Sequence, residues 1–126
     1  ILDADGNTVM KAEPTVVRRT ISGETSDTMR TLIESVVTEG TAKNAKVAGF
    51  SIGGKTGTSE KIDVFDENGQ RVQDKIVSFV GIAPMDDPEY IILAALDTPS
   101  RTTGIYISGG VMAAPTVGAV MADVSP

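Results

Sequence analysis

Two overlapping motifs in residues 49–58 could carry out chemistry, and they imply different reactions. Gly49 to Thr56 has the spacing G-x-x-x-x-G-K-T, the pattern of a loop that wraps around nucleotide phosphates. Lys55 to Thr58 reads K-T-G-T, in which a lysine charge and two hydroxyls could hold a carboxylate. Gly57 has no side chain, so a ligand could approach the backbone there. Because the motifs share Lys55 and Thr56, the flanking elements must decide between them.

The residue types present limit the possible catalytic chemistry. The chain has no cysteine and no histidine, which excludes Cys nucleophiles, Ser-His-Asp triads and most zinc sites. A serine assisted by lysine remains possible, and we expect no cofactor and no metal. Asp3, Asp5 and Asn7 resemble the start of a calcium loop, but Pro14 occupies the position that needs Glu. We therefore predict an ordinary turn there.

Composition excludes other classes of function. Apolar residues make up 40% and charged residues 22%, a balance typical of globular domains. The net charge of −6 argues against a nucleic-acid partner, whose phosphates attract clustered Lys and Arg. The longest apolar run, Tyr90 to Leu96, is too short to span a bilayer. We expect no leader peptide within these residues, and because Ile1 is not a natural start, we expect further sequence upstream.

The residues before the motifs predict a hairpin, a helix and a loop. Ile1 to Val9 turns at Asp5-Gly6-Asn7, and residues 15–21 read as extended. Ser22 or Thr25 can cap a helix that ends at Gly40, and residues 41–49 are predicted to form a surface loop. The apolar stripe of this helix consists of Met29, Leu32, Ile33, Val36 and Val37.

The residues after the motifs predict three strands and a second helix. Lys55 to Phe65 lacks a helical stripe and runs into Glu67-Asn68-Gly69, a hairpin signal. Ile76 to Ala83 is the next strand, and Tyr90 to Leu96 is predicted to be buried on both faces. A loop over residues 99–110 then leads to the helix. Pro115 fits its first turn, and its apolar face consists of Val117, Val120, Met121 and Val124.

These elements favour K-T-G-T over the phosphate loop. A phosphate loop must open a helix, whereas the residues after Lys55 predict a strand. Parallel strands need a crossover of about a dozen residues, and the connections at 68–69 and 84–88 are too short for one. The predicted sheet is therefore antiparallel. Ile91 to Asp97 does resemble a strand that ends in a magnesium ligand, but the nucleotide-hydrolase interpretation becomes the less favoured one.

With the K-T-G-T motif, the chain resembles a penicillin-binding protein. The similarity covers nearly the whole chain, and the pattern most resembles the monofunctional class B transpeptidases of Gram-positive bacteria, of the division and sporulation types. The residues that carry it are Gly40-Thr41-Ala42, Gly53 to Thr58, Phe79 to Pro84 and Ala113-Ala114-Pro115.

The resemblance implies a fold, a reaction and a cellular location. The fold is α+β: three antiparallel strands, of five in the full sheet of the β-lactamase/transpeptidase fold, flanked by two helices. The reaction cross-links peptidoglycan stem peptides through a serine acyl-enzyme, which β-lactam antibiotics also form. The whole protein would be membrane-anchored on the extracytoplasmic face, with a lipid-II-polymerising protein as a possible partner, and would serve cell division, sporulation or cell shape. The chain by itself is expected to be soluble.

The resemblance also assigns roles to the motif. Lys55 supports the electrostatics of the site, and the hydroxyls of Thr56 and Thr58 contact the substrate carboxylate. The Thr58 N–H forms half of an oxyanion hole, a donor worth ~3 kcal/mol in the transition state. A β-lactam sensor and a β-lactamase share this motif and remain alternatives. A glycine-rich turn with a solvated lysine is the plain structural alternative.

The family's other two motifs are absent from this sequence. No serine begins S-x-x-K, and no S-x-N occurs. Residues 1–126 are therefore expected to be the C-terminal portion of a transpeptidase domain, with the nucleophile and its lysine upstream. Because nucleophilic catalysis needs both groups, we predict that this chain alone is not acylated by penicillin. We also expect the strand Tyr90 to Leu96 to expose an apolar edge that can pair with another copy.

Overall fold

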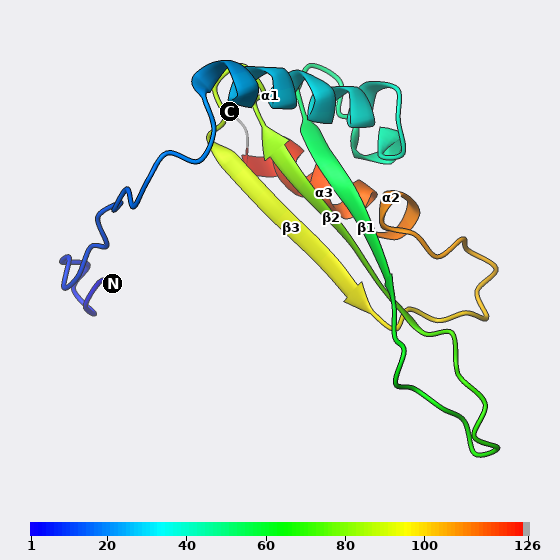
Figure 1. Ribbon diagram of the computed structural model, residues 1–126. Helices are drawn as coiled ribbons and strands as arrows, with labels where there is room; N and C mark the ends of the chain where they lie inside the picture. The colour runs from blue at the N-terminus through cyan, green and yellow to red at the C-terminus, as the bar shows by residue number, and fades with distance from the viewer. Residues whose placement is uncertain (125–126) are drawn as a thin grey trace.

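The computed structural model describes residues 1–124 and contains one antiparallel sheet with helices on one side and across one end (Figure 1). The fold class is α+β, as predicted. Two helices are long, and two single-turn helices were not predicted. In chain order the elements are α1 (Gly23–Thr38), η1 (Lys43–Ala45), β1 (Gly53–Glu60), β2 (Lys75–Ala83), β3 (Tyr90–Asp97), α2 (Gly109–Met112) and α3 (Ala114–Val124).

The three strands pair in the order β1-β2-β3, with antiparallel neighbours throughout. This confirms the predicted strands and their directions, but β1 differs in its bounds. It begins at Gly53, before the motif, and ends at Glu60 rather than at Phe65. The chain then leaves the sheet, and the predicted hairpin forms separately, with a single bridge between Phe65 and Arg71. In Figure 1 this hairpin projects beyond the end of the sheet.

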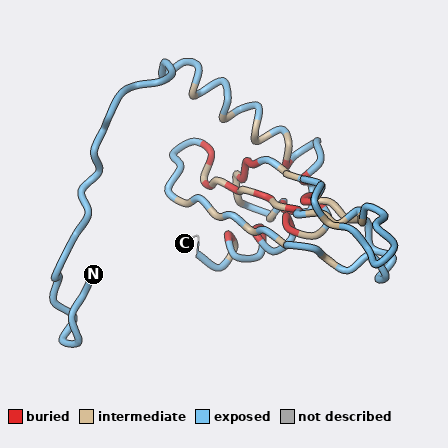
Figure 2. Tube along the Cα trace, turned by 60° about the horizontal axis from the view of Figure 1, so that its bottom comes forward, coloured by how far each residue is buried: buried red, intermediate tan, exposed pale blue. Residues whose placement is uncertain are grey.

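One face of the sheet carries the hydrophobic core, and we call it the covered face. Val77 and Phe79 of β2 are fully buried there, together with Val117 and Met121 of α3. Gly81 lets the helix approach, because a Cβ at Gly81 would lie 2.5 Å from Cγ1 of Val117. Figure 2 shows the buried segments gathered where the sheet meets the C-terminal helices. The predicted helix at Pro115 is confirmed as α3, although only part of its predicted apolar face is buried.

The opposite side of the sheet, which carries Val80, Ile82, Ile91 and Leu93, is called the open face. Alternate residues of β3 are half-buried and exposed, and Ile91 and Leu93 are 71% and 67% exposed. The prediction that this strand is buried on both faces is therefore wrong for the residues that the structure describes. The physical reason is that α2 and α3 lie behind the sheet in Figure 1, on the covered face.

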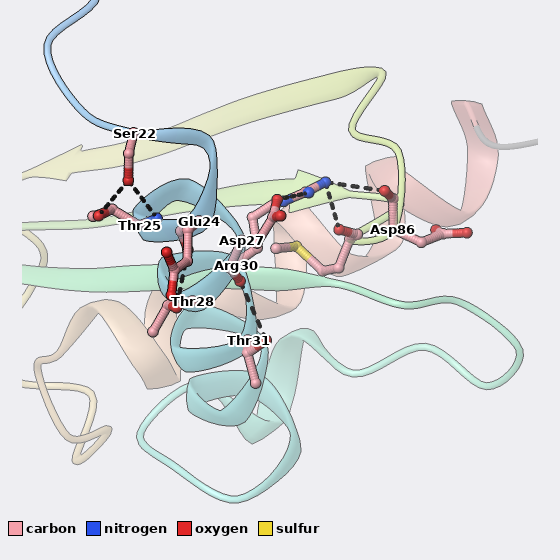
Figure 3. Close-up of polar contacts among 9 residues, drawn as sticks. Ser22, Glu24, Thr25, Asp27, Thr28, Arg30, Thr31 and Asp86 are labelled. Atoms are coloured by element: carbon pink, nitrogen blue, oxygen red, sulfur yellow. Dashed lines mark hydrogen bonds and ion pairs between the residues drawn. The ribbon is translucent and has the colours of Figure 1, made fainter.

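Helix α1 begins as predicted and lies across the start of β1. The Ser22 hydroxyl accepts the N–H of Thr25 at 3.1 Å, and Arg30 donates to the carbonyls of Met85 and Asp86 in the β2–β3 connection (Figure 3). The predicted stripe is only partly buried, because Met29 and Leu32 are exposed. The face of α1 that is at least half-buried is therefore turned slightly from the predicted stripe. Its residues are Ser26, Arg30, Ile33, Glu34, Val36 and Val37.

The predicted surface loop over residues 41–49 is partly a core segment. Ala42, which precedes the single turn η1, and Ala45, its last residue, are fully buried. Gly118 of α3 makes this possible, since a Cβ there would lie 2.7 Å from the carbonyl oxygen of Ala45. Small residues in this segment are therefore a packing requirement, and they do not indicate a solvated loop.

Residues 1–21 extend away from the sheet and are exposed throughout (Figure 2). The predicted hairpin is confirmed by a bridge between Leu2 and Thr8. The carboxylate of Asp3 accepts the N–H groups of Asn7 and Asp5 at 2.8 and 3.0 Å, and these bonds, with that from Asn7 first, lower the pKa of Asp3. Within residues 1–124, no helix is both long and apolar enough to cross a membrane.

Candidate active-site edge

Lys55 to Thr58 lie in the middle of β1, which forms one edge of the described sheet. They pair with Val80 to Val77 of β2, so the inner side of this segment is fixed by the sheet ladder. Neighbouring residues of a strand turn their N–H and C=O groups to opposite edges. The Nζ of Lys55 donates to the carbonyl of Thr56, so this carbonyl is not turned towards β2 but towards the free outer edge. Because the directions alternate along the strand, the N–H and C=O groups of Thr58 also face the outer edge.

The side chain of Lys55 bends along this edge. Its Nζ donates to the carbonyl oxygen of Thr56 at 3.0 Å and to the Thr56 hydroxyl at 3.4 Å. The Thr56 hydroxyl lies 3.3 Å from that of Thr41. One ammonium and two hydroxyls therefore form a connected polar chain. Such a chain of donors is suited to an anionic group such as a carboxylate.

A shallow pocket of about 360 Å³ lies beside this edge. Thr56 and Thr58, two residues apart, both line it, as expected for alternate residues on one face of a strand. Its other walls come from the segment after α1 and from the end of the loop before α3. The remaining lining residues are Thr41, Tyr106, Ser108, Gly109, Gly110 and Val111.

Helix α2 forms the far wall of the pocket, and it was predicted as loop up to Gly110. Ser108 caps it by accepting the N–H of Val111 at 3.3 Å. Gly109 lies so close to the sheet that a Cβ would be 1.9 Å from the carbonyl oxygen of Ser78. Asn44 donates to the carbonyl of Gly110 at 3.0 Å and joins this wall to η1. The pocket therefore has a rigid backbone on two sides.

The structure shows a packing reason for a glycine at position 57, in addition to the predicted approach of a ligand to the backbone. A Cβ at Gly57 would lie 2.5 Å from the hydroxyl oxygen of Ser78. The missing side chain thus makes room for a neighbour on β2, on the side of the strand away from Thr56 and Thr58. Of the four predicted residues, the two threonines line the pocket directly, and Lys55 joins them through Thr56. Thr41 was missed as a site residue. Gly40-Thr41-Ala42 contributed to the family resemblance, but a small polar residue in a predicted loop gives no periodic signal that would place it at the site.

The phosphate-loop interpretation fails on the observed topology. Gly53 to Glu60 is a strand, so no helix N-terminus follows Lys55 to hold phosphates. Asp97, which would be the magnesium ligand, forms an ion pair with Lys61 instead. The sheet is antiparallel in both of its pairings. The nucleotide-hydrolase hypothesis is therefore wrong.

The fold and the site together define an α+β domain with a K-T-G-T strand at the edge of an antiparallel sheet. The family model described as the penicillin binding protein transpeptidase domain matches residues 2–122. The chain belongs to this family.

Individual relatives agree with this assignment. The chain is 44% identical over 120 residues to stage V sporulation protein D of Bacillus subtilis. The matched region covers 94% of this chain and 18% of that protein. It is 38% identical to penicillin-binding protein PbpB of Mycolicibacterium smegmatis, with 77% of the chain and 16% of that protein covered. The chain therefore spans less than a fifth of the length of these two relatives.

Solved structures show the same fold. The transpeptidase domain of penicillin-binding protein 3 from Burkholderia pseudomallei aligns with a TM-score of 0.71 and 36% identity, over 92% of this chain and 34% of that one. Penicillin-binding protein 3 from Mycobacterium tuberculosis, complexed with aztreonam, aligns with a TM-score of 0.68 and 29% identity, over 97% of this chain and 29% of that one. The three-stranded sheet and its helices are thus part of the transpeptidase fold.

Proposed function

We propose that this chain is the C-terminal portion of the transpeptidase domain of a peptidoglycan D,D-transpeptidase. The observation that carries the proposal is the K-T-G-T segment on the outer edge of β1, beside a pocket lined by Thr56 and Thr58. The relatives support it by name, since several are D,D-transpeptidases or penicillin-binding proteins. The whole protein would act on the extracytoplasmic face of the membrane, with a lipid-II-polymerising protein as a partner.

In the proposed reaction, a serine from the upstream part of the domain attacks the penultimate D-Ala carbonyl of a stem peptide. The terminal D-Ala leaves, and an amine from a neighbouring stem peptide resolves the acyl-enzyme. Lys55 and the hydroxyls of Thr56 and Thr58 would hold the substrate carboxylate. The outward N–H of Thr58 would donate to the oxyanion, and the free edge of β1 would pair with the extended peptide.

β-Lactam antibiotics are proposed to acylate the same serine. Solved structures of a relative in complex with aztreonam and with ampicillin support this. The β-lactam carboxylate would occupy the position of the substrate carboxylate, next to the polar chain that Lys55 begins. This chain alone would not be acylated, because the proposed nucleophile is not in its sequence.

The test is acylation by a fluorescent penicillin, measured on the intact transpeptidase domain that contains this chain and on the chain alone. We expect a covalent adduct only with the intact domain, and Lys55→Ala should lower its rate of formation about 100-fold. Lys46→Ala removes a second exposed lysine away from the pocket and should leave the rate unchanged.

Four outcomes would contradict this proposal in different ways. An intact domain that is not acylated would exclude the penicillin-binding function itself. An adduct on the isolated chain would show that the nucleophile lies within these residues. Fast hydrolysis of the adduct would indicate a β-lactamase, and an acylated domain that never transfers the acyl group to an amine would indicate a sensor.

A further inference from the structure

Thr41 stands beside the predicted motif although it lies 15 residues before Thr56 in the sequence. Its hydroxyl oxygen lies 3.3 Å from that of Thr56, and both residues line the same pocket. Thr56 also accepts from the Nζ of Lys55 at 3.4 Å. Thr41 is thus the outermost member of a polar chain that includes two of the predicted site residues.

The backbone around Thr41 is held on both sides. Gly40 donates its N–H to the carbonyl of Ser35 at 3.0 Å, and Ala42 donates to Val36 at 3.1 Å, so the end of α1 fixes the segment. Ala42 is fully buried. The carbonyl oxygen of Thr41 also lies against α2, where a Cβ on Gly110 would approach it to 2.1 Å. An exposed side chain on such a fixed backbone can hold a neighbouring group in one orientation.

The hydrogen bonds available to the Thr56 hydroxyl explain why its orientation matters. A lysine ammonium can only donate, and a hydroxyl has one proton and two lone pairs. The contact with Lys55 occupies one lone pair of the Thr56 hydroxyl. If the Thr41 hydroxyl donates to the second lone pair, both are occupied and the Thr56 proton is left to point into the pocket. A bound carboxylate needs a donor at that place.

We propose that Thr41 is a positioning residue, which turns the Thr56 hydroxyl so that its proton faces an anionic ligand in the pocket. Thr41 acts through Thr56 and does not itself need to contact the ligand. This inference rests on the proposed function, because it assigns Thr41 a part in recognition of the substrate or β-lactam carboxylate.

The experiment measures the second-order rate of acylation by a fluorescent penicillin in the intact transpeptidase domain. Thr41→Val keeps the shape of the side chain but removes the hydroxyl, and we expect the rate to fall about tenfold, as for the loss of one hydrogen bond. Thr41→Ser retains the hydroxyl and should stay within about twofold of the wild type. Thr38→Val is the matched control, since the Thr38 hydroxyl bonds only within its own helix in the described structure.

A double-mutant cycle separates positioning from simple structural support. If Thr41 acts through Thr56, Thr41→Val should not lower the acylation rate further in a Thr56→Val background. If the two residues acted independently, the fold-changes of the two single variants would multiply in the double variant. The melting temperature of the Thr41→Val variant should match that of the wild type, because Thr41 is exposed.

The outcomes distinguish this inference from the proposed function. A wild-type domain that is acylated, with Thr41→Val at the wild-type rate, would overturn the role of Thr41 alone. Multiplicative effects in the double variant would do the same. A wild-type domain that is not acylated would overturn the proposed function and with it this role, because there would be no reaction for the hydroxyl to serve.

Discussion

The two faces of the sheet differ in how completely they are packed, although the same three strands form both. On the covered face, glycines let α3 approach until Phe79 and Val117 are fully excluded from water. On the open face, Ile91 and Leu93 are aliphatic yet mostly exposed. The residue types of β3 are therefore suited to burial on both sides, and the described residues supply a cover for only one.

This contrast bears on the position of the site. The pocket beside β1 opens on the same side as α2, where glycines and hydrogen bonds fix the backbone. Among the described residues, side-chain polar contacts on the open face of β3 are confined to its end, where Asp97 contacts Lys61 and Thr98. Rigid packing thus supports the polar edge of the sheet at β1. At β3, by contrast, the apolar side chains of the open face are left exposed. The proposed upstream part of the transpeptidase domain is the natural candidate to cover it.

Truncation of one large side chain on each face should give the largest difference. Phe79→Ala should lower the free energy of unfolding by about 4 kcal/mol, because it leaves a cavity at a fully buried position. Leu93→Ala should change it by less than about 0.5 kcal/mol, because Leu93 is already in water. Urea unfolding of the chain at low protein concentration measures both. Equal losses at the two positions would show that the faces are not different.

The open face should also cause this chain to self-associate when it is isolated. An exposed apolar face next to an unpaired strand edge is a template for a second copy. Sedimentation should show association that increases with concentration, and Leu93→Lys should shift the chain towards the monomer. Val16→Lys is the control, because Val16 is 86% exposed but lies in the N-terminal arm, away from the sheet. A wild-type chain that stays monomeric at high concentration would contradict this prediction.

The elements that the sequence predicted well are those with a strong local signal. The cap at Ser22, the turn at Asn68-Gly69 and the first turn at Pro115 each depend on the chemistry of one or two residues, and the structure has all three features. Pairing directions followed from short connections. The K-T-G-T motif could be located because its spacing is fixed along the chain.

The elements that were mispredicted depend on what packs against them. Leu32 and Leu93 are apolar in sequence, but whether they are buried depends on neighbours far along the chain or outside it. Ala42 and Ala45 looked like loop residues, because small size can indicate either solvent or close packing. Thr41 became part of the site only through the fold, which brings the end of α1 next to β1.

The smallest expected effect concerns the ion pair on the open-face side, at the end of β3. Asp97 accepts from Lys61 and, at 2.7 Å, from the Thr98 hydroxyl, and these bonds, with that from Lys61 first, lower the pKa of the Asp97 carboxyl below its ordinary value of 3.8. A carboxyl with a lowered pKa in the folded state stabilises the fold above its unfolded pKa. That stability is lost as the pH falls through the folded pKa. The affected window therefore lies at and below pH 3.8.

Lys61→Met should raise the pKa of Asp97 towards its ordinary value, which an NMR titration of the carboxyl would detect. The unfolding midpoint of the variant should approach that of the wild type in acid, where the protonated carboxyl no longer pairs with Lys61. Because the Asp97 side chain is exposed, 1 M salt should reduce the difference between the two proteins. Arg71→Met removes a different surface pair, with Glu60, and should leave the Asp97 titration unchanged. An Asp97 pKa that is the same with and without Lys61 would contradict this prediction and would mean that the pair does not persist in water.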